Sequence, residues 1–372
     1  MLIGVPKEIK NHEYRIGLTP DSVKELIRNG HQVMVENNGG AAIGFDNDQY
    51  EAAGAEIVAT PQEIFERAEM IVKVKEPQPN ECEMLREGQV LFTYLHLAPD
   101  LRQTELLVKS GATCIAYETV TDNAGTLPLL APMSEVAGRM SIQAGAHHLE
   151  KAQGGQGVLL GGVPGVAPAK VLVIGGGVVG ANAATMALGM GADVTILDRS
   201  VPRLRELDKE FEGKVKCVYS TAAAIEQYAL EADLVVGAVL IPGAAAPRLL
   251  TRDQISRMKD GAVVVDVAID QGGCFETSKA TTHQDPTYVV DGVVHYCVAN
   301  MPGGVARTST MALNNVTLPY AISLANMGAK AAMLKDVHLL NGLNVHKGMI
   351  TYDAVATAHG MEFVAPAEAL EK

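Results

Sequence analysis

The chain has 372 residues, enough for two domains with separate cores, and a formal net charge of −13 at pH 7. This acidic balance, with no cluster of Lys and Arg in the sequence, argues against nucleic acid and anionic membrane surfaces as partners. No apolar run is long enough to span a bilayer, and the first ten residues lack the apolar stretch of a signal peptide, so we expect a cytoplasmic protein.

The N-terminal part of the chain alternates between strand and helix patterns. Residues 3–5 are predicted as a strand, after which Thr19 and Pro20 begin a helix as N-cap and first residue, and Gly30 ends it. Four further strands are expected, at residues 32–36, 70–75, 90–94 and 114–117. Such alternation is typical of a largely parallel sheet with helices on both faces.

A long amphipathic helix is predicted over residues 134–153, with Ser134 as its N-cap, and a glycine-rich loop follows it. A second series of strands is then expected at residues 171–174, 193–197, 217–219, 234–238, 263–267 and near 294–298. The pattern is helical over residues 313–328 and 329–340.

These elements predict an α/β fold of two Rossmann-like domains with parallel sheets, linked by long helices. The first domain is expected to comprise residues 1–130, completed by residues 306–372. It would bind the substrate, and a dinucleotide-binding domain would occupy residues 131–305.

The most informative motif opens the second series of strands. The apolar run 171–174 leads directly into Gly175-Gly176-Gly177-Val178-Val179-Gly180, a Gly-x-Gly-x-x-Gly sequence before a helical pattern. In such a motif the first glycine permits a tight turn, the second lets the backbone approach a pyrophosphate, and the third lets helix and strand pack closely. The next strand ends on Asp198, whose carboxylate would meet ribose hydroxyls and repel a 2′-phosphate. The cofactor is therefore predicted to be NAD rather than NADP.

Several polar residues are expected at the carboxyl ends of predicted strands, where open α/β sheets bind ligands. They are Arg15, Lys75, His96, Glu118, Asp266 and Asp270. Each one alone is compatible with a surface or core position, and their convergence on strand ends favours a functional site. We predict no metal site, because His147 and His148 are adjacent on a helix and the five cysteines lack Cys-x-x-Cys spacing.

Several longer segments carry a resemblance to a known family. They are Ile3-Gly4-Val5-Pro6-Lys7-Glu8, Glu13-Tyr14-Arg15, Lys73-Val74-Lys75-Glu76-Pro77, Thr93-Tyr94-Leu95-His96-Leu97-Ala98, Pro132-Met133-Ser134-Glu135-Val136-Ala137-Gly138, Gly161-Gly162-Val163-Pro164-Gly165-Val166, Asp266-Val267-Ala268-Ile269-Asp270-Gln271-Gly272-Gly273 and Val298-Ala299-Asn300-Met301-Pro302-Gly303. With these segments the chain resembles, over its whole length, the bacterial L-alanine dehydrogenases. The NAD-binding component of proton-translocating transhydrogenase shares several of these motifs.

The resemblance implies NAD-dependent oxidative deamination of L-alanine to pyruvate and ammonium, which is reversible. It implies that Arg15 binds the substrate carboxylate with its planar fork, that Lys75 polarises the carbonyl, and that His96 and Asp270 are the catalytic acid/base groups. It also implies a homo-oligomer, with a hexamer as the expected state.

Further cofactor contacts carry over from the family onto matching positions of this chain. They are Ser134, Gly175, Gly177, Val178, Gly180, Asp198, Arg203, Ser220, Val239, Leu240, Val267, Ala268, Ile269, Asp270, Lys279, Val298, Ala299, Asn300 and Met301. Position 279 departs from the family pattern, in which an arginine is usual, and lysine cannot make the forked contact of arginine. A cofactor contact from Lys279 therefore stays open.

Three alternatives are compatible with parts of this pattern. The NAD-binding component of transhydrogenase would explain the glycine loop and Asp198, but it gives no reason for Lys75, His96 and Asp270 together. A related opine or lysine-pathway dehydrogenase would share the reaction type and differ in its substrate pocket. A catalytically silent NAD-binding protein is the alternative outside the enzymes.

Overall fold

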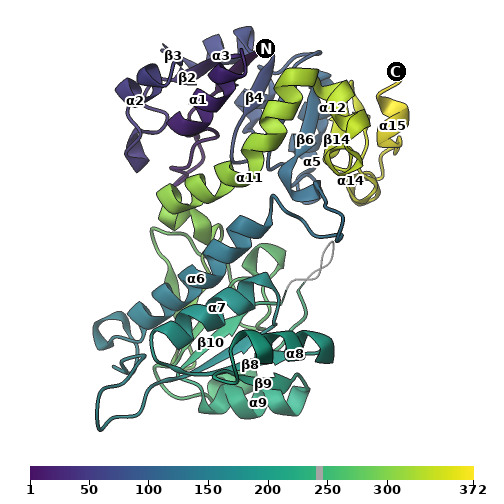
Figure 1. Cartoon of the computed structure of the whole chain (residues 1–372). Coiled ribbons are helices and arrows are strands. Elements are labelled where there is room, and N and C mark those ends of the chain that lie inside the picture. The colour runs from purple at the N-terminus through teal and green to yellow at the C-terminus, as the bar shows by residue number, and fades with distance from the viewer. Residues whose placement is uncertain (240–245) are drawn as a thin grey trace. The chain divides into compact units, whose positions relative to one another are not determined.

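The computed structural model describes residues 1–239 and 246–372, and these form two compact units. Unit 1 consists of Met1–Pro132 and Val305–Lys372, and unit 2 of Met133–Gly304 (Figure 1). The chain passes from unit 1 to unit 2 within helix α6 (Ala131–His148), and returns at the last residue of the short helix η5 (Met301–Val305). None of the helices in the described ranges has the length and apolar character needed to cross a membrane.

Unit 1 contains an eight-stranded sheet in the order β15-β14-β6-β5-β4-β1-β2-β3. Its strands are β1 (Leu2–Val5), β2 (Gln32–Glu36), β3 (Glu56–Val58), β4 (Met70–Val72), β5 (Val90–Thr93), β6 (Thr113–Ala116), β14 (Leu343–His346) and β15 (Met349–Ile350). Strands β1 to β6 are parallel, and their order β3-β2-β1-β4-β5-β6 is that of a Rossmann sheet.

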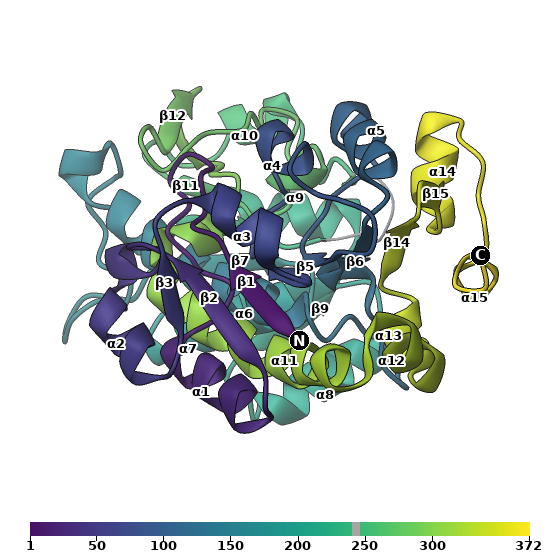
Figure 2. The same ribbon diagram turned by 90° about the horizontal axis from the view of Figure 1, so that it is seen from above.

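Helices cover both faces of this sheet. Figure 2 shows α3 (Pro61–Arg67), α4 (Pro79–Cys82) and α5 (Leu101–Ser110) on one side, and α1 (Pro20–Arg28), α11 (Ala306–Met327) and α12 (Ala329–Lys335) on the other. The remaining helices are α2 (Asn47–Ala52), α13 (Val337–Leu340), α14 (Asp353–His359), α15 (Pro366–Ala369), and the 3₁₀ turns η1 (Ala41–Ile43) and η2 (Tyr117–Thr119). Because both faces are covered, the central strands β4, β5 and β6 are buried along their whole length.

Unit 2 contains a seven-stranded sheet in the order β12-β13-β11-β10-β7-β8-β9. Its strands are β7 (Lys170–Ile174), β8 (Asp193–Asp198), β9 (Lys216–Tyr219), β10 (Leu234–Gly237), β11 (Val263–Asp266), β12 (Thr287–Val290) and β13 (Val293–Tyr296). The parallel part, β9-β8-β7-β10-β11-β13, repeats the strand order of unit 1. The predicted α/β class with two Rossmann-like domains is confirmed.

The helices of unit 2 include α7 (Val178–Gly189), α8 (Val201–Glu210), α9 (Ala222–Glu231) and α10 (Arg252–Ser256), with the 3₁₀ turns η3 (Lys151–Gln153) and η4 (Ile269–Gln271). Figure 1 shows α8 beside β8 and β9, in agreement with the contacts between these elements. The Ala-rich face of α7 packs into the core of the unit, where Ala183, Ala184 and Ala187 are fully buried.

The start of the first helix follows the prediction. Thr19 is the N-cap of α1, its Oγ1 accepts a hydrogen bond from the Ser22 N–H at 3.2 Å, and Pro20 occupies the first helical position. The helix ends at Arg28, and Gly30 follows with φ of 85°.

The long helix before the glycine-rich loop was predicted with wrong ends. Helix α6 begins at Ala131, so that Ser134 lies inside its first turns and is not the N-cap. Pro132 is compatible with this early start, because the first helical N–H groups have no partner within the helix. The helix ends at His148 rather than at Gln153, and the separate turn η3 leads into Gly154, whose φ is 88°.

Both sheets are largely parallel, as predicted, and their antiparallel pairs lie at the sheet edges. Strand β12 pairs antiparallel with β13, and β14 pairs antiparallel with both β6 and β15. The two hairpins turn at Asp291-Gly292 and at Lys347-Gly348, where all four residues have positive φ. An Asp-Gly pair between apolar runs is a strong hairpin signal, and it could have identified β12 from the sequence.

Candidate functional site

The glycine-rich turn of unit 2 lies at the switch point of its sheet, between β7 and β10. A Cβ at Gly175 (φ 106°) would lie 2.7 Å from the Ala238 carbonyl oxygen, and one at Gly180 only 1.8 Å from that of Gly175. Both positions therefore require glycine for packing. A Cβ at Gly177 would meet no protein atom within 4 Å, so this side of the turn is open to a ligand.

Helix α7 begins directly after this open side. Its N-cap is Gly177, which offers no side-chain acceptor to the first N–H groups of the helix. Unpaired N–H groups at a helix start, beside a turn without side chains, suit the pyrophosphate of a dinucleotide. Ser134, the predicted pyrophosphate contact, is half-buried on α6, and a Cβ at Gly138 of that helix would lie 2.2 Å from the Val179 carbonyl oxygen of α7.

Asp198 and Arg203 hold the backbone N–H and the backbone carbonyl of one residue in the glycine turn, Gly176. The Gly176 N–H donates to Asp198 Oδ2 at 2.7 Å, and Arg203 Nε donates to the Gly176 carbonyl oxygen at 2.7 Å. The second oxygen of Asp198 accepts from the Ser200 N–H at 2.7 Å, and the Ser220 N–H donates to the Asp198 carbonyl oxygen. The end of β8 thus fixes the turn, and Ser220 lies next to it.

Asp266, the last residue of β11, is fully buried and organises the loop that carries Asp270. Its carboxylate accepts from the Ala268 N–H at 3.0 Å and from the Cys274 N–H at 2.8 Å, and Ser278 Oγ donates to it as well. Asp270 itself lies in η4 and is exposed. A fully buried carboxylate with these donors fixes the backbone on both sides of Asp270.

The other predicted cofactor residues lie at or after strand ends of the same sheet. Val239 follows β10, the range 267–269 follows β11, and the range 298–301 follows β13, whereas Leu240 lies outside the described residues. Lys279 is exposed, and its ammonium lies 5.3 Å from the centre of the Tyr288 ring.

In unit 1 the predicted substrate residues follow four strands at one edge of the sheet. Arg15 lies in the segment after β1, Lys75 after β4 and His96 after β5, while Glu118 lies in η2 directly after β6. Because these strands are parallel, their carboxyl ends meet at one edge, which includes the switch point between β1 and β4. Asp270 belongs to unit 2.

Arg15 is buried, with 2% of its surface exposed, and is paired with Glu13. Nε donates to Glu13 Oε1 at 2.7 Å and Nη2 to Glu13 Oε2 at 2.6 Å. Burial alone would lower the pKa of Arg15, but the Glu13 carboxylate outweighs burial and raises it. The guanidinium is therefore charged, and its plane is fixed by a two-pronged contact.

A buried triad that the sequence did not reveal lies beside Lys75. Lys73 is fully buried and donates to Glu8 Oε2 at 3.0 Å and to Glu81 Oε1 at 2.8 Å. Burial would lower the pKa of Lys73, but the two carboxylates outweigh it and raise the pKa, and burial raises the pKa of Glu8. Glu8 Oε1 also accepts from the Val74 N–H at 2.7 Å and the Lys75 N–H at 3.2 Å.

These last contacts explain why the strand predicted at residues 70–75 ends at Val72. The N–H groups of Val74 and Lys75 donate to the Glu8 carboxylate instead of to a neighbouring strand, so the ladder stops. The side chain of Lys75 then forms an ion pair with Glu76 at 3.2 Å. Burial would raise the pKa of Glu76, but Lys75 and Lys10 lower it to about 2.

His96 lies in a turn with φ of 50°, a left-handed conformation that L residues rarely adopt. Its side chain is 45% exposed, and its ring stacks on that of the buried Tyr94 with centroids 5.9 Å apart. The carboxylate of Glu118 accepts hydrogen bonds from the backbone N–H groups of Leu95 and His96. The strand predicted at residues 90–94 accordingly ends at Thr93.

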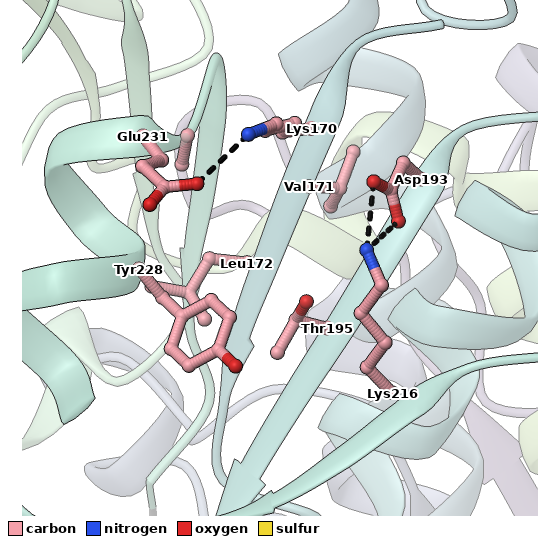
Figure 3. Close-up of a pocket in the computed structure, with 9 residues that line it drawn as sticks. Lys170, Val171, Leu172, Asp193, Thr195, Lys216, Tyr228 and Glu231 are labelled. Atoms are coloured by element: carbon pink, nitrogen blue, oxygen red, sulfur yellow. Dashed lines mark hydrogen bonds and ion pairs between the residues drawn. The ribbon is translucent and has the colours of Figure 1, made fainter.

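Two cavities lie away from these residues, at the opposite edges of the sheets. A cavity of about 40 Å³ is lined by the first residues of β7, β8 and β9, with ion pairs between Lys170 and Glu231 and between Lys216 and Asp193 (Figure 3). A larger cavity of about 430 Å³ adjoins the starts of β5 and β6 in unit 1. The smaller one has room for little more than a water molecule, so neither its size nor its place suits a dinucleotide.

Two family models together match most of the chain. Residues 4–137 match the model "Alanine dehydrogenase/PNT, N-terminal domain", and residues 141–353 match "Alanine dehydrogenase/PNT, C-terminal domain". Alanine dehydrogenase of Halomonas elongata is 63% identical over 364 residues, which are 98% of this chain and 98% of that protein. Alanine dehydrogenase of Bacillus subtilis is 56% identical, over 100% of this chain and 98% of that protein.

Solved structures give the same result. An L-alanine dehydrogenase structure matches with a TM-score of 0.94 and 52% identity, covering 97% of this chain and 99% of that one. A transhydrogenase structure from Sinorhizobium meliloti matches with a TM-score of 0.81 and 24% identity, covering 95% of this chain and 100% of that one; the second likeness concerns the fold alone.

Proposed function

The chain belongs to the alanine dehydrogenase/PNT family, and on that premise we propose that it converts L-alanine to pyruvate and ammonium with NAD, and catalyses the reverse reaction. The observation that carries this proposal is the set of Arg15, Lys75 and His96 at one sheet edge of unit 1. A NAD-binding component without amino acid chemistry has no need of that set.

Substrate binding is assigned to two cations of unit 1. Arg15 offers the planar guanidinium that a carboxylate prefers, and Glu13 holds that plane in place. Lys75 supplies a compact ammonium that polarises the carbonyl of pyruvate and stabilises negative charge on its oxygen. Because Arg15 is buried, its contact with a substrate carboxylate is poorly screened by water.

The proton transfers are assigned to His96 and Asp270. When bound, the nicotinamide ring of the cofactor accepts hydride from the alanine Cα, which leaves an iminium on the substrate. Water adds to that iminium with loss of one proton. The resulting carbinolamine then gains a proton on its nitrogen and loses its hydroxyl proton as ammonia departs. An imidazole accepts and donates protons near neutral pH, which suits His96, and Asp270 is the proposed second acid/base group.

The preference for NAD over NADP is proposed to depend on Asp198. Replacing Asp198 by alanine should reduce this preference by roughly tenfold or more, since a charge-assisted hydrogen bond is worth about 1.5–3 kcal/mol. Because Asp198 also holds the Gly176 N–H, Asp198→Asn is the matched control: its amide oxygen still accepts that hydrogen bond but carries no charge. The measurement is kcat/KM for each cofactor, and an unchanged ratio in both variants would place cofactor discrimination elsewhere.

The role of Arg15 is tested by a change that keeps its charge. Arg15→Lys should raise KM for pyruvate by roughly tenfold or more, because an ammonium cannot make the forked contact. The Kd for NADH should stay within about twofold of the wild-type value, as the proposed cofactor contacts belong to unit 2. Steady-state kinetics and NADH fluorescence measure the two quantities, and an equal rise in both would argue against a substrate-specific role.

The activity itself is tested with the purified protein, NAD and a panel of L-amino acids. Reduction of NAD with L-alanine, accompanied by pyruvate formation, is the expected result. Activity restricted to a different amino acid would favour the opine or lysine-pathway reading. We also propose a cytoplasmic homohexamer that acts in L-alanine catabolism, and light scattering on the purified protein measures the number of subunits.

A further inference from the structure

We propose that Glu118 is a positioning residue for His96, holding the turn that presents the imidazole to the substrate. This inference rests on the proposed function, because it assumes that His96 takes part in proton transfer. The role of Glu118 follows from its contacts, its burial and the conformation of the residue it holds.

The topology brings the two residues together. Strands β5 and β6 are parallel neighbours, with Thr93 of β5 opposite Ala116 of β6. His96 lies three residues beyond Thr93, and Glu118 lies two residues beyond Ala116 in η2. Both residues therefore lie at the same edge of one sheet.

The carboxylate of Glu118 binds two consecutive backbone N–H groups. Oε1 accepts from the His96 N–H at 2.6 Å and from the Leu95 N–H at 3.0 Å. Oε2 lies 3.2 Å from the Leu95 nitrogen. Hydrogen bonds to a charged acceptor are about twice as strong as those between neutral groups. With 15% of its side chain exposed, Glu118 makes them in a place of limited solvent access.

The conformation of His96 needs such support. Its φ of 50° lies in the left-handed region. A residue other than glycine adopts this region only where surrounding contacts favour it. Gln103 Nε2 adds a second contact to this turn by donating to the Leu95 carbonyl oxygen at 3.0 Å. Glu118 is the charged partner of the turn, and its two hydrogen bonds span the peptide that enters His96.

The same carboxylate also lies close to the imidazole ring of His96. His96 Nδ1 lies 3.9 Å from Glu118 Oε1, beyond hydrogen-bond distance but within reach of an ionic contact when the ring is protonated. On its other side the ring stacks on Tyr94, whose hydroxyl donates to the Leu129 carbonyl oxygen at 2.6 Å. The imidazole is therefore oriented from the backbone and from Tyr94, although its side chain is 45% exposed.

The test is a double-mutant cycle in the intact enzyme. Glu118→Ala should lower kcat for reductive amination of pyruvate at least tenfold, with Kd for NADH unchanged within twofold. In a His96→Ala background the same change should have less than a twofold effect, because the group that Glu118 positions is gone. Glu105→Ala, which removes an exposed glutamate from the adjacent α5, should leave kcat unchanged in both backgrounds.

Glu118→Gln is the conservative variant, and it distinguishes loss of the two hydrogen bonds from a general folding defect. Its amide oxygen still accepts from the two N–H groups, so it should retain more than a third of the wild-type kcat. Three results would overturn the proposal: wild-type kcat in Glu118→Ala, an equal loss with and without His96, or a Gln variant as slow as the Ala variant. Absence of alanine-dependent NADH formation by the unmodified enzyme would instead refute the proposed function.

Discussion

Replacing His96 with alanine is expected to lower kcat for reductive amination of pyruvate by a factor of about 10²–10⁴, the range typical of a lost general acid/base. The Kd for NADH should be nearly unchanged, because the dinucleotide turn belongs to unit 2 and His96 to unit 1. Single-turnover measurements at saturating NADH separate the loss of chemistry from a loss of binding.

His147→Ala is the matched control for this variant. His147 is a histidine of similar exposure, 52% against 45%, and it lies on α6 with Glu150 as its ion-pair partner. Its replacement should leave kcat unchanged. Turnover like that of the wild type in the His96 variant would refute the acid/base role of His96, and with it the assignment of the proton transfers.

Replacing Lys73 with methionine is expected to destabilise unit 1 by about 3–5 kcal/mol, since removing one partner of a buried ion pair leaves charges uncompensated. Here Glu8 and Glu81 would both lose their cation, at positions where the side chains are only 2% exposed. The activity should fall as well, because Glu8 also holds the backbone of Lys75. Chemical denaturation followed by circular dichroism measures the shift in midpoint.

Lys170→Met isolates the effect of burial from that of the ion pair. Lys170 pairs with Glu231 at 2.8 Å, the same distance as Lys73 to Glu81, but both partners are about half exposed. Solvent screens such a pair, so the control variant should unfold at nearly the wild-type midpoint. Equal shifts for the two variants would show that burial of the triad adds nothing to the stability of unit 1.

The sequence predicted those features that depend on local signals. The cap at Thr19 and Pro20, the glycine turn after β7 and the strand ending on Asp198 are all visible within a few residues. Each depends on backbone geometry that a particular residue type favours: a side-chain acceptor, a fixed φ, or the lack of a Cβ.

The features that sequence reasoning missed depend on contacts between distant parts of the chain. Strands β4 and β5 end early because carboxylates accept hydrogen bonds from the backbone N–H groups that follow them. Glu8 lies 66 residues from Val74 after β4, and Glu118 lies 22 residues from His96 after β5. The partners of Arg15 and Lys73 are also glutamates, which in a sequence look like ordinary surface residues until the fold shows them to be buried. Glu118 was among the predicted strand-end residues, because it directly follows the strand expected at 114–117, but the sequence does not show which N–H groups its carboxylate binds.

The division of unit 1 into two segments has a consequence for synthesis on the ribosome. Strand β6 pairs with β14, and the Ile16 and Thr19 N–H groups donate to Thr310 and Asn314 of α11, so these contacts join residues more than 200 positions apart. The emerging chain therefore makes the first six strands of this sheet, then the whole of unit 2, before the strand that covers the β6 edge leaves the exit tunnel. For that interval β6 is an open edge, the kind of surface that recruits chaperones or a second nascent chain, whereas unit 2 is made from one continuous stretch and is complete first.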